Sequence, residues 1–264
     1  MSNKNIIKLI LFIMIISITT IFSLKLYQII LDNEIAKRVL SHRGSSGEEI
    51  EHTWASYDLA LDYGSRYIEE DIVLSKDGTL YISHDFTAKR IAGLDMPFNE
   101  MTDDEINTLI TKDDQRLLTV KETFDRYKKK RLTFILEIKD ESAILPLLQL
   151  IKDYHYEKRV IVQCFNYEIL RVVKDFNPII KTTFLTATQE DFEFGVNLPF
   201  VDTISVEKTF MNQENCDYAH KKGKDFNVYT LNSTEEIKTA IEIGVDNYYT
   251  NFTAKAIMLE KKYR

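Results

Sequence analysis

The first 31 residues differ in pattern from the rest of the chain. A run from Leu9 to Leu24 contains no charged residue and only Ser and Thr as polar interruptions, and apolar residues continue to Leu31 with Lys25 among them. About 20 such residues are enough to cross a bilayer as a helix. Because the run is apolar on every face, a buried core helix explains it poorly. We therefore predict that residues 1–31 form an N-terminal membrane anchor.

The charges around this run predict its orientation. Lys4 and Lys8 precede it and favour an N-terminus on the inner side. A cleavable signal peptide is the rival interpretation, but no small-x-small pattern follows the run, which ends in residues 22–27. We expect an uncleaved single-pass anchor in the cell membrane. Residues 32–37 are expected to be a short polar link, with the remaining domain on the outer face.

From residue 38 onward, short apolar segments alternate with helical patterns. A strand at 38–41 is followed by a helix at 53–63 with a Gly64 stop, a strand at 67–74 and a turn at 75–78 that returns as a strand at 79–83. Further strands are expected at 131–139, 160–163, 180–185, 203–206, 226–231 and 247–250, and further helices at 119–130, 142–154, 167–176, 212–222, 233–243 and 252–262.

Strands that alternate with helices predict a parallel sheet. Eight such units in about 225 residues suit a (β/α)8 TIM barrel, whose site lies at the carboxyl ends of the strands. Residues 38–264 contain no Pro-, Gly- or Ser-rich linker, so we predict one domain. Residues 86–116 form an insertion after the second strand, with a capped helix at 102–110, and they are expected to lie over one face.

Two carboxylates stand out on the second strand. Residues two apart in a strand share a face, so Glu69 and Asp71 point one way while Ile68 and Ile72 point the other. Glu70 falls on the face opposite the pair. Adjacent carboxylates repel unless a positive charge lies between them, and a divalent cation with oxygen ligands is one solution. A solvated strand end is the alternative for this pair.

Histidines and basic residues follow other predicted strands. His42 and His84 each end a short strand, and two such histidines can supply one base and one acid near neutral pH. Arg43 adds a planar cation suited to a phosphate. Alternation in the third core strand puts Glu137 and Lys139 on one face, and a salt bridge at a solvated rim is the alternative there.

The order and spacing of these residues resemble the glycerophosphodiester phosphodiesterase family. The matching motifs are His42-Arg43-Gly44, Glu51-His52-Thr53, Ile68-Glu69-Glu70-Asp71, Lys76-Asp77-Gly78, His84-Asp85 and Glu137-Ile138-Lys139. Later pieces from Val162 to Phe165, from Tyr229 to Asn232 and from Gly244 to Asp246 are also similar. The chain departs from the family pattern at His52, where Asn is usual, and at Glu70, where an apolar residue is usual.

The resemblance implies a set of site residues. Glu69, Asp71 and Glu137 would hold one divalent cation, Ca²⁺ or Mg²⁺, while His42 and His84 would act as base and acid. Arg43 and Lys139 would bind phosphate oxygens, and Glu51 would be an outer ligand or a binder of glycerol hydroxyls. Gln163 and Tyr229 would line the mouth, although packing explains them equally well. The insertion would help to shape that mouth.

The implied activity is metal-dependent hydrolysis of glycerophosphodiesters to glycerol 3-phosphate and an alcohol. Lysophospholipase D activity and cleavage of an envelope glycerophosphate polymer are alternatives within the same chemistry. Bacterial phosphoinositide phospholipases also pair two histidines, but the carboxylate pairs at 69–71 and 137–139 favour the first interpretation. A catalytically inactive, anchored binding module is an alternative of another class.

Composition excludes some partners and frameworks. The whole chain has a net charge of −7, and its first 31 residues hold three lysines and no acid, so the remainder carries −10. An acidic domain argues against nucleic acid as a partner. Cys164 and Cys216 are too few for a disulfide framework and match no metal spacing, so we expect inert thiols.

Overall fold

A computed structural model describes residues 3–263 of the chain. These residues divide into two compact units, one reaching to Ala36 and the other beginning at Lys37. The predicted anchor begins at Met1 and the predicted domain ends at Arg264. Three residues of these segments lie outside the described residues, namely Met1, Ser2 and Arg264. The second unit contains the sheet and every predicted site residue.

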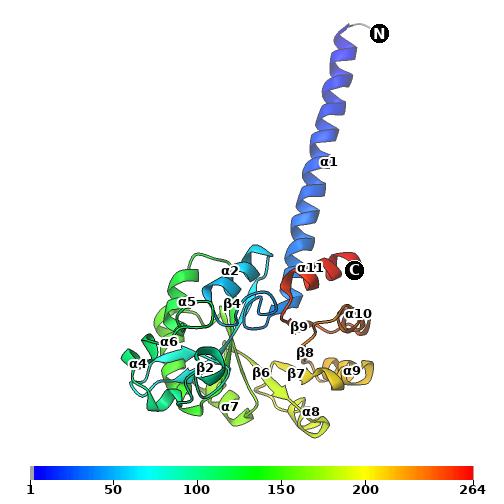
Figure 1. Ribbon diagram of the computed structural model, residues 1–264. Helices are drawn as coiled ribbons and strands as arrows, with labels where there is room; N and C mark the ends of the chain where they lie inside the picture. Colours follow the sequence, from blue (N-terminus) through cyan, green and yellow to red (C-terminus); the bar gives the residue numbers. More distant parts are fainter. Residues whose placement is uncertain (1–2, 264) are drawn as a thin grey trace. The chain divides into compact units, whose positions relative to one another are not determined.

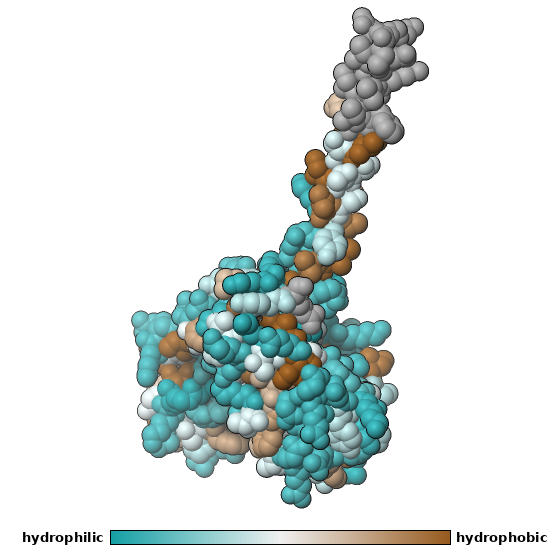
Figure 2. All heavy atoms as spheres, turned by 90° about the vertical axis from the view of Figure 1, so that its right-hand side faces the viewer, coloured by the Kyte–Doolittle hydropathy of each residue, from teal (hydrophilic) through white to brown (hydrophobic). Residues whose placement is uncertain are grey.

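The N-terminal segment is one long helix, α1 (Asn3–Arg38). Its part from Met14 to Arg38 is long and apolar enough to cross a membrane, a test that signal sequences also pass. Hydrophobic side chains line this part of the helix (Figure 2). The short polar link expected at 32–37 is the last part of this helix. This stretch contains no Gly or Pro to stop the helix, and Lys37 and Arg38 in the last turn of α1 interact favourably with the helix dipole at its C-terminus.

The second unit is a closed barrel of parallel strands with helices between them, as predicted (Figure 1). The barrel strands are β1 (Val39–Ser41), β2 (Tyr67–Leu74), β4 (Thr133–Ile138), β5 (Val160–Cys164), β6 (Lys181–Thr186), β7 (Thr203–Glu207), β8 (Asp225–Tyr229) and β9 (Asn247–Thr250). Pairing of β1 with both β9 and β2 closes the barrel.

The helices follow the strands in chain order. They are α2 (Trp54–Asp62), α5 (Val120–Tyr127), α6 (Ile144–Tyr154), α7 (Tyr167–Phe176), α8 (Gln189–Gly195), α9 (Gln213–Lys221), α10 (Thr234–Ile243) and α11 (Thr253–Tyr263), with short 3₁₀ turns η2 (Glu141–Ala143) and η3 (Lys208–Phe210). Helix α8 was not predicted, because it is only seven residues long and ends at a glycine. Gly195 packs against the Phe184 ring too closely for any side chain there.

The insertion after β2 is a small substructure with its own apolar cluster. Strand β3 (Leu80–Ile82) returns antiparallel to β2, and α3 (Lys89–Ala92), η1 (Phe98–Glu100) and α4 (Asp103–Asn107) follow. Phe98, Met101 and Ile106 are buried in this cluster. A capping box at Thr102 begins α4, as the sequence predicts, but the helix ends earlier than residue 110.

Strand register brings three of the predicted site residues into one layer of the barrel, while Glu69, two residues earlier on β2, pairs with Ile135. Asp71 on β2 pairs with Glu137 on β4, and Glu137 pairs with Gln163 on β5. Below this layer, Leu40, Ile135 and Tyr249 form a buried apolar cluster inside the barrel. The polar layer therefore lies above this apolar cluster, towards the carboxyl ends of the strands. Barrel enzymes have their active sites at that end.

Candidate active site

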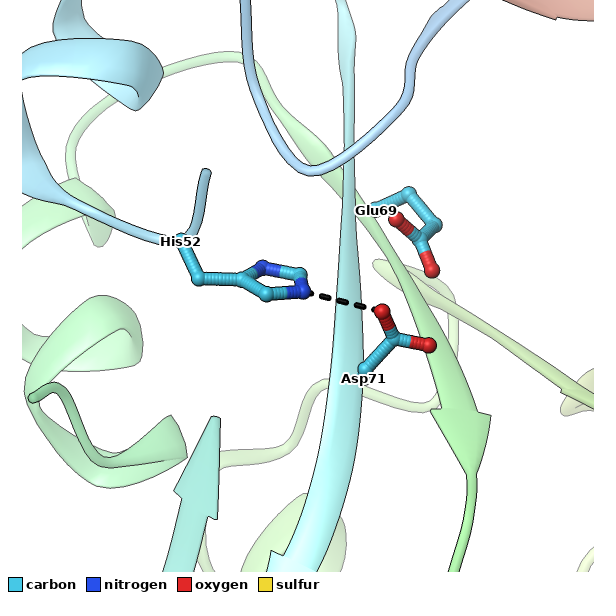
Figure 3. A group of neighbouring side chains, drawn as sticks. All are labelled: His52, Glu69 and Asp71. Carbon is cyan, nitrogen blue, oxygen red and sulfur yellow. Dashed lines mark hydrogen bonds and ion pairs between the residues drawn. The ribbon is translucent and has the colours of Figure 1, made fainter. Parts of the chain in front are cut away.

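Glu69 and Asp71 point into the barrel, as alternation along β2 predicts. Both are almost fully buried. A Glu69 oxygen accepts a hydrogen bond of 2.9 Å from the backbone N–H of Arg43, and Asp71 Oδ2 lies 2.9 Å from His52 Nε2. Figure 3 shows the imidazole of His52 directed at the Asp71 carboxylate, with Glu69 beside it. The strand-end carboxylates are therefore not solvated.

The buried carboxylates of this part of the barrel create an electrostatic environment that favours a bound cation. Burial and the charges of Asp71 and Glu137 raise the pKa of Glu69 well above its ordinary value. Burial, together with the charge of Asp71, raises the pKa of Glu137 to about 7. Burial also opposes ionisation of Asp71, but the hydrogen bond with His52 and the charges of Lys139 and Arg43 hold its pKa below the usual range. Three ionised carboxylates here need more positive charge than the side chains supply.

The donor set fits a divalent cation. Asp71 Oδ1 is buried and accepts no hydrogen bond from any residue in the described part of the chain, its nearest cation being Lys139 Nζ at 3.5 Å. One ligand atom each from His52, Glu69 and Asp71 lies within 4.8 Å of the others. Two carboxylates with a free acceptor oxygen suit a hard cation. A neighbouring imidazole either ligates the ion or orients the carboxylate.

Two basic side chains lie against these carboxylates. Arg43 Nε is 3.3 Å from Asp71 Oδ2, and Lys139 Nζ is 2.6 Å from Glu137 Oε1. Arg43 also forms a salt bridge with Glu51, which in turn holds Arg90 of the insertion at 2.8 Å. Burial opposes ionisation of Glu51, yet hydrogen bonding with Arg90 and the nearby positive charges lower its pKa to about 2. Glu51 thus orients two cations at the rim.

The two predicted histidines differ in their surroundings. His42 Nδ1 lies 2.7 Å from Asn251 Oδ1, and burial together with the charge of Arg43 lowers the pKa of His42 to about 4. His84 is partly exposed, and its Nδ1 lies 2.7 Å from Asp85 Oδ1. Burial also lowers the pKa of His84, although the hydrogen bond with Asp85 opposes that shift. Both imidazoles line one cavity.

That cavity, called the catalytic cavity below, has a volume of about 150 Å³. Its lining includes His42, Arg43, His84, Glu137, Lys139, Gln163 and Tyr229. Gln163 donates to Glu137 Oε2 at 3.2 Å and accepts from the Tyr249 hydroxyl at 2.5 Å, so it fixes one carboxylate of the layer. Tyr229 donates to the Thr186 carbonyl at 3.0 Å.

Comparisons with known proteins identify the family of this chain. The model of the glycerophosphoryl diester phosphodiesterase family matches residues 42–255. The chain belongs to this family. A glycerophosphodiester phosphodiesterase from Caldanaerobacter subterraneus is 28% identical over 243 residues, covering 85% of this chain and 98% of that protein. A human lysophospholipase D is 22% identical and covers 90% of this chain and 92% of its own length.

Solved structures share the barrel. A glycerophosphodiester phosphodiesterase from Thermotoga maritima superposes with a TM-score of 0.73 at 26% identity, covering 84% of this chain and 97% of that one. A phosphodiesterase from Oleispira antarctica, solved with its product sn-glycerol-3-phosphate, gives a TM-score of 0.77 at 21% identity. The match covers 85% of this chain and 96% of that one. The TIM-barrel prediction is thereby confirmed.

Several residues at the site are not predicted by the sequence pattern. His52 departs from the family pattern, and the sequence alone indicates no role for it. Its φ of 58° places it in the left-handed region, which turns the imidazole onto Asp71 from a loop 19 residues earlier. Asn251 directly follows the last strand and contacts His42. Its position at a strand end is the signal that would have found it. Arg90 comes from the insertion, which could not be folded from sequence.

Glu70 points away from the site, as alternation predicts. It is fully buried, one oxygen lies 3.3 Å from Thr123 Oγ1 of α5, and the other has no hydrogen-bond partner among residues 3–263. A buried, unsatisfied carboxyl oxygen costs about 1–3 kcal/mol. The free energy of unfolding of the Glu70→Leu variant, measured by urea denaturation, is therefore expected to be higher than that of the wild type by up to about 1–3 kcal/mol. The Glu70→Gln variant keeps a polar group at this position, so its free energy of unfolding should rise less. A free energy of unfolding lower than wild type in Glu70→Leu would contradict this interpretation.

Proposed function

We propose that this family member hydrolyses glycerophosphodiesters to glycerol 3-phosphate and an alcohol. The observation that carries the proposal is the convergence of two histidines, three carboxylates and two basic side chains on one barrel mouth. A phosphodiester needs its negative charge neutralised, a base for the nucleophile and an acid for the leaving group. Each requirement has a residue of the right type in this layer.

His42 is the proposed base. Its lowered pKa keeps it neutral at pH 7, so that it can accept a proton. Asn251 fixes the ring through Nδ1 and leaves Nε2 to receive the proton. The glycerol 2-hydroxyl of the substrate would give up that proton and attack phosphorus, forming a P–O bond while the bond to the alcohol breaks. Water would then open the resulting cyclic phosphate.

His84 is the proposed acid. It is more exposed than the carboxylate layer, and Asp85 orients it and partly opposes the burial that lowers its pKa and disfavours its protonated form. In that form it would donate a proton to the departing alkoxide. Arg43 and Lys139 would bind the non-bridging phosphate oxygens, because both are held in place by carboxylates and face the cavity.

We propose Ca²⁺ or Mg²⁺ as the cofactor, held by Glu69, Asp71 and Glu137. When bound, such an ion neutralises phosphate charge and lowers the pKa of a hydroxyl. His52 holds Asp71 Oδ2 and leaves Oδ1 free, so it serves this site by fixing a ligand. Calorimetric titration of each ion into the metal-free protein distinguishes the two.

Attack by the 2-hydroxyl is tested by ³¹P NMR during turnover. A cyclic glycerophosphate signal that appears before glycerol 3-phosphate, and the lack of any reaction with a 2-deoxy substrate, are the expected results. Full turnover of the 2-deoxy substrate would mean that water attacks directly. A lysolipid and an envelope glycerophosphate polymer remain the alternative substrates, and the human lysophospholipase D relative favours the lysolipid among them.

The chain is proposed to be anchored in the cell membrane with its catalytic domain outside. The basic residues Lys4 and Lys8 and the apolar stretch of α1 support this orientation. Protease treatment of intact cells is expected to release the domain and its activity into the medium. Complete protection, with digestion only after lysis, would contradict the outer location.

A further inference from the structure

A second groove opens beside the catalytic cavity. The two share His84, Glu137, Lys139 and Phe165, and the groove, with a volume of about 450 Å³, is the larger. The residues that belong to the groove alone are Asp85, Phe86, Ile138, Glu141, Cys164 and Asn166. This side groove therefore adjoins the catalytic cavity at the proposed acid and at a proposed phosphate ligand.

A phosphodiester has two ester arms, and the site has two compartments to match. The catalytic cavity contains His42, the proposed base for the glycerol hydroxyl, while the side groove does not. His84, the proposed acid for the departing alcohol, faces both compartments. If phosphate lies between Lys139 and His84, glycerol occupies the cavity next to His42. The leaving alcohol then extends into the side groove.

The side groove has the chemistry of a site for an organic cation. Phe86 and Phe165 are 59% and 47% exposed, which is high for large apolar side chains beside a catalytic centre. Aromatic faces attract ammonium groups through their quadrupole, and quaternary ammonium is the ligand best suited to them. Glu141 adds an exposed carboxylate, held at 2.6 Å by Asn166 Nδ2. Asp85 is already engaged by His84 and Arg90.

We propose that the side groove binds the ammonium group of the leaving alcohol, so that the preferred substrates are choline-type glycerophosphodiesters. The inference rests on the proposed function, because it assigns one arm of that substrate. Phe86 and Phe165 supply the aromatic faces and Glu141 the compensating charge. The net charge of −10 on residues 32–264 acts in the same direction, since it disfavours diesters whose alcohol is neutral or anionic relative to zwitterionic ones.

The test compares two diesters of equal shape with the full-length chain in detergent. One is glycerophosphocholine, and the other carries 3,3-dimethylbutanol, the uncharged isostere of choline. The ratio of their kcat/KM values is expected to be about threefold to thirtyfold in favour of choline, the range of a cation–aromatic contact. Phe86→Leu, Phe165→Leu and Glu141→Gln should each lower that ratio. Phe176→Leu, at an exposed phenylalanine (41%) at the end of α7, should leave it unchanged.

Binding of free choline, followed by saturation-transfer NMR, gives a readout that does not depend on turnover. Choline binding that weakens in the two phenylalanine variants supports the groove assignment even if no diester is hydrolysed, in which case only the proposed function fails. Equal kcat/KM for the two diesters, or choline binding that is unaffected by both variants, overturns the assignment. Preference for the uncharged isostere overturns it as well and identifies an apolar site.

Discussion

Replacing His84 with alanine is expected to lower kcat/KM for glycerophosphocholine by about 10²–10⁴-fold, the usual contribution of a general acid. The loss should be much smaller for a glycerophosphodiester of p-nitrophenol, because that alcohol leaves without protonation. His84 is the proposed acid on geometric grounds, since it lines both the catalytic cavity and the side groove. Steady-state kinetics on the two substrates measures the difference.

The His42→Ala variant provides the matched comparison. If His42 is the base, its loss should lower kcat/KM for both substrates to a similar extent. Since burial and Arg43 lower the pKa of His42 to about 4, protonation of His42 itself should reduce wild-type activity only as pH approaches that value. His155→Asn, at an exposed turn after α6, is the control and should behave as wild type. Equal losses on both substrates for His84→Ala would refute its role as acid.

Replacing Asp71 with asparagine is expected to weaken binding of the divalent cation by more than about 100-fold. The substitution removes the charge and one acceptor oxygen from the layer where Oδ1 has no hydrogen-bond donor among the described residues. Changing an orienting partner of a metal ligand typically costs about 10–100-fold in affinity, and loss of the ligand should cost more. Calorimetric titration of Ca²⁺ and Mg²⁺ into the metal-free variant measures this effect.

His52 and Glu70 supply the comparisons for this experiment. His52→Ala should lose about 10–100-fold in cation affinity, because Asp71 Oδ2 loses its donor at 2.9 Å. His52→Asn keeps a donor amide and should lose less. Glu70→Gln, next in sequence but directed to the other side of β2 towards Thr123, should leave the affinity unchanged. Unchanged affinity in Asp71→Asn would exclude Asp71 as a ligand.

The sequence predicts the barrel and the catalytic layer because both depend on alternation along strands. Glu69, Asp71 and Glu137 each fall on an inward position of their strand, and parallel register then places Asp71 opposite Glu137 without knowledge of any loop. His42 and Lys139 follow for the same reason. The inward direction of these side chains follows from the sequence pattern, whereas their roles follow only from the family resemblance.

The residues that sequence reasoning missed depend on loops. His52 reaches Asp71 through a left-handed backbone conformation that no periodicity indicates. Arg90 and Phe86 come from the insertion, whose fold depends on packing of its own apolar cluster. Helix α8 is not predicted because it is only seven residues long. The predicted link at 32–37 is helical because it contains no residue that stops a helix. In each case a contact distant in sequence or a missing stop signal decided the structure.

The most direct test of the central claim is release of glycerol 3-phosphate from glycerophosphocholine by the full-length chain in detergent. The reaction should be measured with Ca²⁺, with Mg²⁺ and with EDTA, beside the His42→Ala variant. We predict release with at least one of the two ions, no release with EDTA, and recovery when the ion is restored. Failure to release glycerol 3-phosphate from this diester, from glycerophosphoglycerol or from a lysophospholipid, with the cation shown to be bound, would contradict the account and favour a polymer substrate or a binding module.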